Sequence, residues 1–175
     1  MKAQLSFEYY FALIIFVMFV SSLFLKLITF FPFYSAEIEN QRLRSEAYQI
    51  SELLINDVGY PGNWYEVYES ELEKVKRLGL SDGGKNKTNL ISMDKATAFN
   101  DLCQSSLPLG YDKVLELLDV KDGFWVLLTN DKVDSPEILI GCSPNEFSSK
   151  IRTNITRIIA FDDGSFGQLR VSVWK

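Results

Sequence analysis

The chain has an almost purely apolar segment close to its N-terminus. From Tyr9 to Val20 the only polar side-chain groups are two tyrosine hydroxyls, and the apolar character continues to Phe33. At about 1.5 Å per residue, a helix from Leu5 to Lys26 is about 31 Å long, which matches the hydrocarbon thickness of a bilayer. We therefore expect a helix that crosses a membrane once and has Lys26 near one interface.

Three polar residues come directly before this apolar segment. Gln4, Ser6 and Glu8 alternate with apolar residues and follow a short leader that ends in Lys2-Ala3. An ordinary secretory signal has its small-residue cleavage site after the apolar core, so that the core is removed. Here the small and polar residues come first, and a cut between Ala3 and Gln4 would leave the apolar helix on the mature protein.

This arrangement resembles the archaeal class III signal peptide, the N-terminal signal of a family of type IV pilin-like proteins. The resemblance covers about the first twenty residues. It implies that a membrane prepilin peptidase recognises Gln4, Ser6 and Glu8 and cuts the bond between Ala3 and Gln4. It also implies an assembly role for Glu8, the fifth residue of the mature chain, whose carboxylate would meet the N-terminal amine of a neighbouring subunit.

Other interpretations of this N-terminus remain open. The segment could be an uncleaved signal anchor, or a conventional signal peptide cut near Val20-Ser21-Ser22. The second is disfavoured because apolar residues resume at Leu23-Phe24-Leu25. Glu8 could also mark the headgroup boundary and serve peptidase recognition alone, since a carboxylate within an apolar span is costly unless it is paired.

An amphipathic segment follows the apolar one. Pro32 is expected to kink or locally open the helix, because proline lacks an N–H group. Beyond it, apolar residues at spacings of four, three and four favour a continuing helix that lays one stripe on a head domain; they are Leu43, Ala47, Ile50 and Leu54. The breaker cluster Gly59-Tyr60-Pro61-Gly62 should end this helix. The expected organisation is a leader peptide at 1–3, a transmembrane or filament-core helix at 4–34, an amphipathic extension at 35–58 and an extracytoplasmic head at 59–175.

The residues after the breaker cluster predict a small α+β head. Ser92 can cap a helix that runs towards Cys103, and a second helix is expected over 112–118. Strand-length apolar runs follow at 124–128, 137–140, 157–161 and 168–173, with a hairpin turn at 162–165. The expected fold class is α+β and type IV pilin-like: a long N-terminal hydrophobic and amphipathic α-helix, then two helices on an antiparallel sheet of three to five strands.

Composition excludes several function classes. The chain contains no histidine, which removes Ser-His and Cys-His nucleophilic machinery and most catalytic zinc sites. A net charge of −5 argues against a nucleic-acid partner, since that affinity rests on clustered lysine and arginine. We therefore expect no enzymatic activity, no cofactor, no metal and no nucleic-acid binding.

Four further residues are candidates for covalent modification. Cys103 and Cys142 are either disulfide-bonded or two buried free thiols, and the sequence leaves both alternatives open. Asn86 and Asn154 each begin an N-x-[ST] acceptor pattern for N-glycosylation of an exported chain. Asn86 lies in a glycine-rich loop, whereas Asn154 lies in strand-like sequence and is expected to be unmodified.

Taken with the resemblance, these features imply a structural subunit, most simply a minor pilin. It would be processed by the prepilin peptidase and would assemble with other pilin subunits through its N-terminal helix into a cell-surface filament. The alternative is a single-pass membrane-anchored surface protein whose extracytoplasmic head binds a partner without forming filaments. Lys2 on one side of the span and Arg42 and Arg44 on the other do not settle the orientation. The resemblance implies that the head is extracytoplasmic.

Overall fold

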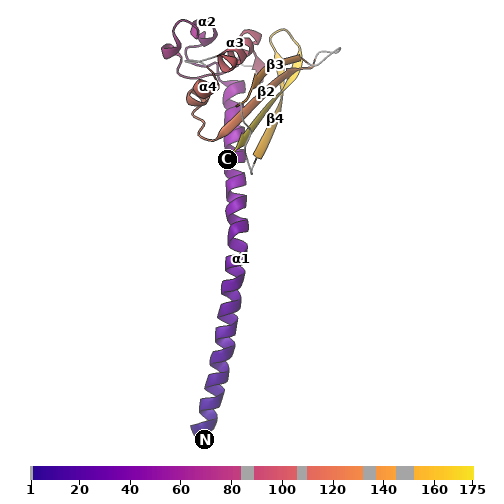
Figure 1. Cartoon of the computed structure of the whole chain (residues 1–175). Coiled ribbons are helices and arrows are strands. Elements are labelled where there is room, and N and C mark those ends of the chain that lie inside the picture. Colours follow the sequence, from indigo (N-terminus) through magenta and orange to yellow (C-terminus); the bar gives the residue numbers. More distant parts are fainter. Residues whose placement is uncertain (1, 84–88, 106–109, 132–136, 145–151) are drawn as a thin grey trace. The chain divides into compact units, whose positions relative to one another are not determined.

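A computed structural model describes residues 2–83, 89–105, 110–131, 137–144 and 152–175, without the side chains of 2–6 and 152 (Figure 1). The fold is α+β, with a long N-terminal helix and a head built on a mixed sheet, as the sequence predicts in outline. The chain divides into two compact units, residues 1–41 and residues 42–175, which are described separately.

The first unit consists of the N-terminal part of helix α1 (Lys2–Asn56). Its large apolar side chains are exposed, and by length and composition this segment can cross a membrane. The hydroxyl of Thr29 donates to the carbonyl of Leu25 at 2.8 Å, and that of Ser35 donates to the carbonyl of Phe31 at 3.2 Å. These hydroxyls are thus satisfied within the helix, as apolar surroundings require. Pro32 lies inside α1 without ending it.

The second unit begins within α1, at Arg42. The predicted apolar stripe is confirmed: Leu43, Ala47 and Leu54 have no exposed surface, and Ile50 is also buried. These side chains belong to the same apolar core as the helices and strands of the head. The head therefore takes in residues 42–58 in addition to 59–175, because the stripe supplies part of its core.

The chain leaves α1 through a tight turn. Gly59 has a positive φ of 79° and lies against Trp64, where an added Cβ would come within 2.4 Å of the indole ring. The Trp64 indole N–H donates to the carbonyl of Gly79 at 2.9 Å. Two short helices follow, α2 (Trp64–Val67) and the 3-10 helix η1 (Leu72–Lys74). Neither was predicted from the sequence.

A buried lysine of a later helix, Met93–Gln104, holds the residues just after α1 in place. The Lys95 ammonium donates to the carbonyls of Val58 and Ser81, each at 2.8 Å, and only 3% of the residue is exposed. Burial lowers the pKa of Lys95, and the negative charges of Asp82 and Asp57 oppose that shift. Lys95 thereby ties three segments of the head together.

The head contains two longer helices and a five-stranded sheet. The helices are α3 (Met93–Gln104) and α4 (Tyr111–Leu118). The strands are β1 (Leu90–Ile91), β2 (Gly123–Asn130), β3 (Glu137–Cys142), β4 (Arg152–Phe161) and β5 (Phe166–Trp174). Their order in the sheet is β1-β4-β5-β2-β3. The two helices, the four longer strands and the hairpin turn at 162–165 confirm the sequence prediction, although several elements are longer than expected.

The prediction of a wholly antiparallel sheet is wrong. Strand β1 pairs in parallel with β4, Leu90 opposite Ala160 and Ile91 opposite Phe161, so the sheet is mixed. Two residues are too few to produce an alternating pattern of apolar and polar residues, so β1 could not be predicted from such a pattern. Ser92 lies at the N-cap of α3 but makes no capping bond with its side chain. Instead, the Met93 N–H faces the Asp162 carboxylate at 3.4 Å.

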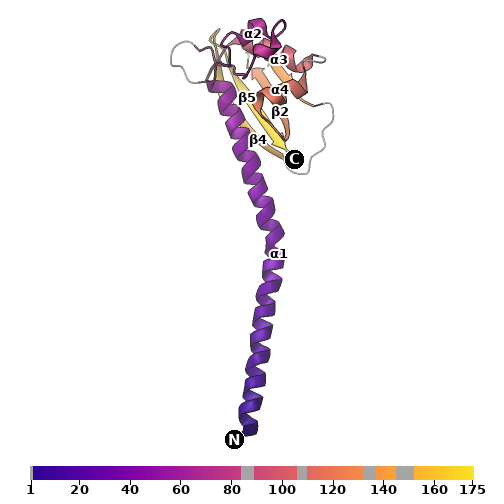
Figure 2. The same ribbon diagram turned by 90° about the vertical axis from the view of Figure 1, so that its left-hand side faces the viewer.

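The two faces of the sheet have different surroundings. Figure 1 shows α3 and α4 on the same side of the sheet as the end of α1. Alternate residues of the central strands are buried, as in the pattern of β2, whose Phe124, Val126 and Leu128 have no exposed surface. The opposite face exposes Ile158 of β4 and, on β3, Ile138, which are 75% and 66% exposed. Figure 2 shows the same elements after a quarter turn.

Candidate functional site

The sequence-predicted processing site lies in the first turns of α1. The backbone is helical at Ala3, Gln4 and Ser6, whose side chains lie outside the described part of the structure. Glu8 is described and is exposed on the helix surface. The structure thus places the four predicted residues on one helix and describes the side chain of Glu8 alone among them.

Glu8 lies in a shallow apolar groove of the helix surface. The groove measures about 370 Å³ and is lined by Phe7, Glu8, Phe11, Ala12 and Ile15. Positions 8, 11, 12 and 15 recur at helical spacing, so they share one face. Between Lys2 and Lys26, Glu8 is the only charged residue of the sequence.

The chemistry of this groove is that of a single anion in apolar surroundings. A carboxylate accepts hydrogen bonds but donates none, so its natural complement is a cation that can donate, such as an ammonium group. Within the described residues, no ion pair involves Glu8. Its charge would need a partner from outside the described chain when this surface leaves water.

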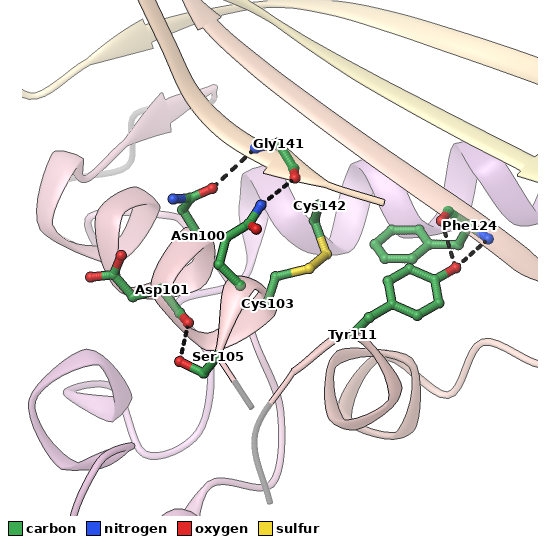
Figure 3. The surroundings of a disulfide bond; sticks show 9 residues. Asn100, Asp101, Cys103, Ser105, Tyr111, Phe124, Gly141 and Cys142 are labelled. Atoms are coloured by element: carbon green, nitrogen blue, oxygen red, sulfur yellow. Dashed lines mark hydrogen bonds between the residues drawn. A yellow bond between two sulfur atoms is a disulfide. The ribbon is translucent and has the colours of Figure 1, made fainter. Parts of the chain in front are cut away.

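The two cysteines are joined. Cys103 of α3 and Cys142 of β3 form a disulfide with their Cα atoms 5.7 Å apart (Figure 3). Of the two alternatives left open by the sequence, the structure therefore has the disulfide. Both residues are buried, so the bond is part of the packing between helix and sheet.

A cluster of polar side chains fixes the end of α1 to strand β4. Arg157 forms an ion pair with Glu52, its Nε donates to the Ser51 hydroxyl at 3.4 Å, and its guanidinium lies 4.6 Å from the centre of the Tyr48 ring. Hydrogen bonding from Tyr48, with further contributions from Arg157, lowers the pKa of the Glu52 carboxyl. A lowered carboxyl pKa stabilises the fold above the unfolded-state value, and that contribution is lost as pH falls through the folded-state value.

The sequence analysis did not identify this cluster. Arg157 interrupts an otherwise apolar run, and it shares a face of β4 with Ile155 and Ile159. An inward-facing arginine on a covered strand needs an acidic partner on the element that covers it, and this signal could have pointed to Glu52. The cluster joins the end of α1 to β4.

The structure describes one of the two candidate glycosylation sites, Asn154. Asn86 lies outside the described residues. Asn154 is exposed within β4, where its side-chain oxygen accepts a hydrogen bond from the Ser172 hydroxyl at 2.7 Å. Asn154 is therefore accessible but sits in a strand that is paired with β5, opposite Ser172.

The described part of the chain contains no group of three or more His, Cys, Asp or Glu side chains that could hold a metal ion. The Asp163 carboxylate accepts hydrogen bonds from the backbone and hydroxyl of Ser165, at 2.8 and 2.6 Å, which is how an aspartate stabilises a tight turn.

No family model, curated protein or solved structure matches this chain.

Proposed function

We propose that the chain is an archaeal type IV pilin-like structural subunit, most simply a minor pilin. It is cut between Ala3 and Gln4 by a prepilin peptidase and is retained in the membrane by α1. From there it assembles through the same helix into a cell-surface filament, with its head outside the cell. The observation that carries the proposal is Glu8, a lone carboxylate in an apolar groove of an exposed helix.

The apolar surface of α1 extends further than a membrane anchor needs. A span from Leu5 to Lys26 already has the length of the hydrocarbon layer, about 30 Å. Beyond it, Phe31 and Phe33 are 73% and 68% exposed, and Ile38 is 67% exposed. Side chains of this kind need apolar partners outside the bilayer, and copies of the same helix provide them.

Glu8 gives this helical assembly a defined register. Its charge is costly in an apolar bundle unless a cation compensates it. After cleavage before Gln4, each subunit has a free N-terminal amine close to the depth of Glu8. The amine of one copy can then pair with the carboxylate of the next, which fixes how far adjacent helices are offset.

The head is consistent with a location outside the cytoplasm. Its two cysteines form a disulfide, and disulfides persist in oxidising compartments. The resemblance of the N-terminal signal implies the same orientation. The sequence lacks histidine, and we propose a structural role for the chain.

The alternative is a single-pass surface protein that uses α1 only as an anchor. The length and composition of α1 fit a single-pass anchor as well as they fit a pilin-like subunit, since both need one apolar span. The two accounts differ in whether α1 contacts copies of itself. They therefore assign different roles to Glu8.

The variant Glu8→Gln separates these accounts, because it keeps the shape of the side chain and removes its charge. We expect this variant to be inserted and cleaved but to enter filaments roughly a hundredfold less than the wild type, as the loss of one partner of a buried ion pair costs about 3 kcal/mol or more. The measurement is the amount of subunit in the sheared-filament fraction relative to the membrane fraction. Tyr10→Phe, which removes a polar group without changing charge, is the control and should assemble normally.

Other outcomes would revise the proposal. Accumulation of uncleaved precursor would mean that Glu8 serves the peptidase. Normal cleavage, with no sheared filament fraction from either the variant or the wild type, would favour the single-pass anchor.

A further inference from the structure

Strand β3 lies at one edge of the sheet. It pairs with β2 on one side, and β2 in turn pairs with β5. The backbone groups on the outer side of an edge strand can pair with a strand of another molecule, which makes such edges sites of aggregation. The other edge strand, β1, has two residues, and Ile91 also forms a bridge with Ser81.

Side chains of α3 occupy the outward-facing backbone N–H and C=O of one residue of β3, Gly141. The Gly141 N–H donates to the side-chain oxygen of Asn100 at 3.1 Å, and the Gln104 amide nitrogen donates to the carbonyl of Gly141 at 2.8 Å. An incoming strand would use the same N–H and C=O pair. Figure 3 shows the side chain of Asn100 reaching Gly141 beside the disulfide.

The geometry of α3 makes this double contact possible. Asn100 and Gln104 are four residues apart, so they lie on the same face of the helix. Cys103 lies between them in sequence and is bonded to Cys142, the neighbour of Gly141. The disulfide thus holds the helix where its two amides meet the strand. A side-chain amide carries the same donor and acceptor groups as a peptide bond, and here the two side chains replace a neighbouring strand.

We propose that Asn100, Gln104 and the disulfide form a seal that prevents β3 from pairing edge to edge with β3 of a second copy of this chain. Ile138, at the other end of the strand, is 66% exposed and makes an unsealed edge apolar as well as unpaired. The seal has its largest effect where many copies are held close together, because edge-to-edge pairing is favoured at high local concentration. The inference goes beyond the proposed function and does not depend on it.

The test is the double variant Asn100→Ala/Gln104→Ala of the full chain in detergent micelles. Both changes remove the amides and leave the disulfide and the helix backbone. We expect at least a tenfold rise in the associated fraction over the wild type at equal concentration, measured by sedimentation. An infrared amide I band of intermolecular β-sheet should appear with it. The control is Thr97→Ala/Asp101→Ala, which changes two exposed side chains of the same helix and should sediment as the wild type does.

A lysine placed on the strand distinguishes edge pairing from general unfolding. In the double-alanine background, Ile138→Lys should restore the wild-type sedimentation, because a charge on an edge strand opposes pairing. Gln168→Lys is the control: Gln168 is exposed on the same face of the sheet, but its strand β5 is paired on both sides there, with β2 and with β4. It should not restore the wild-type behaviour.

Three results would overturn the proposal. The double-alanine variant could sediment as the wild type does, which would mean that the amides seal nothing. The two lysines could suppress association equally, which would place the contact on the exposed face of the sheet. Association that neither lysine suppresses would come from unfolding of the head.

Discussion

A fragment that begins at Tyr60 is expected to lose cooperative folding, whereas a fragment that begins at Arg42 is expected to fold. The shorter fragment lacks five buried apolar residues of α1, which are Leu43, Ala47, Ile50, Leu54 and Ile55. Burial of each leucine or isoleucine contributes about 1.5 to 3 kcal/mol, so the four large side chains together contribute roughly 6 to 12 kcal/mol. That is comparable to the whole stability of a typical domain, about 5 to 15 kcal/mol.

Urea unfolding of the two fragments, followed by near-ultraviolet circular dichroism, measures this difference. A matched pair of substitutions in the longer fragment tests the same point without changing its length. Leu54→Asp puts a charge into the core and should abolish the transition, whereas Gln49→Asp lies on the exposed side of α1 and should change little. Equal transition midpoints for the two fragments would mean that α1 does not contribute to the core of the head.

Removal of the disulfide is expected to produce the second large effect. The bond links residues 39 positions apart, and closing a loop of that length in the unfolded chain corresponds to about 4 kcal/mol of stability. The double variant Cys103→Ala/Cys142→Ala should therefore unfold at a clearly lower denaturant concentration than the wild type. Equilibrium unfolding of the Arg42 fragment is the measurement.

The single cysteine variants provide the control for this prediction. Either substitution breaks the same link, so each single variant should lose nearly as much stability as the double variant, and the effects should not add. A loss below about 1 kcal/mol in the double variant would show that packing between α3 and β3 holds these elements without the bond.

Elements with strong periodicity could be predicted from the sequence, and those fixed by a few long-range contacts could not. The stripe of α1, the helices α3 and α4 and the four longer strands each repeat an apolar pattern over several residues. Strand β1 has two residues and owes its place to parallel pairing with β4, which comes some 70 positions later in the chain. No local pattern reports a contact of that kind.

The candidate sites also differ in whether they could be predicted from local sequence. The N-terminal motif is local, so Glu8 could be singled out from the sequence, whereas the partner that we propose for its charge belongs to another subunit. The pairing of Cys103 with Cys142 could not be decided, because the sequence does not show whether two Cα atoms come within bonding range. The contacts of Asn100 and Gln104 with Gly141 depend on how a helix sits on a strand edge, and nothing in the residue types alone predicts them.

The central claim is that the chain is cut before Gln4 and enters a filament with its apolar helix retained. The most direct measurement is mass spectrometry of the N-terminal peptide of this protein in the sheared-filament fraction. The account predicts a chain in that fraction that begins at Gln4, as glutamine or as its cyclised form. A chain that begins in the twenties or thirties, or one that keeps Met1-Lys2-Ala3 and is confined to the membrane fraction, would contradict it.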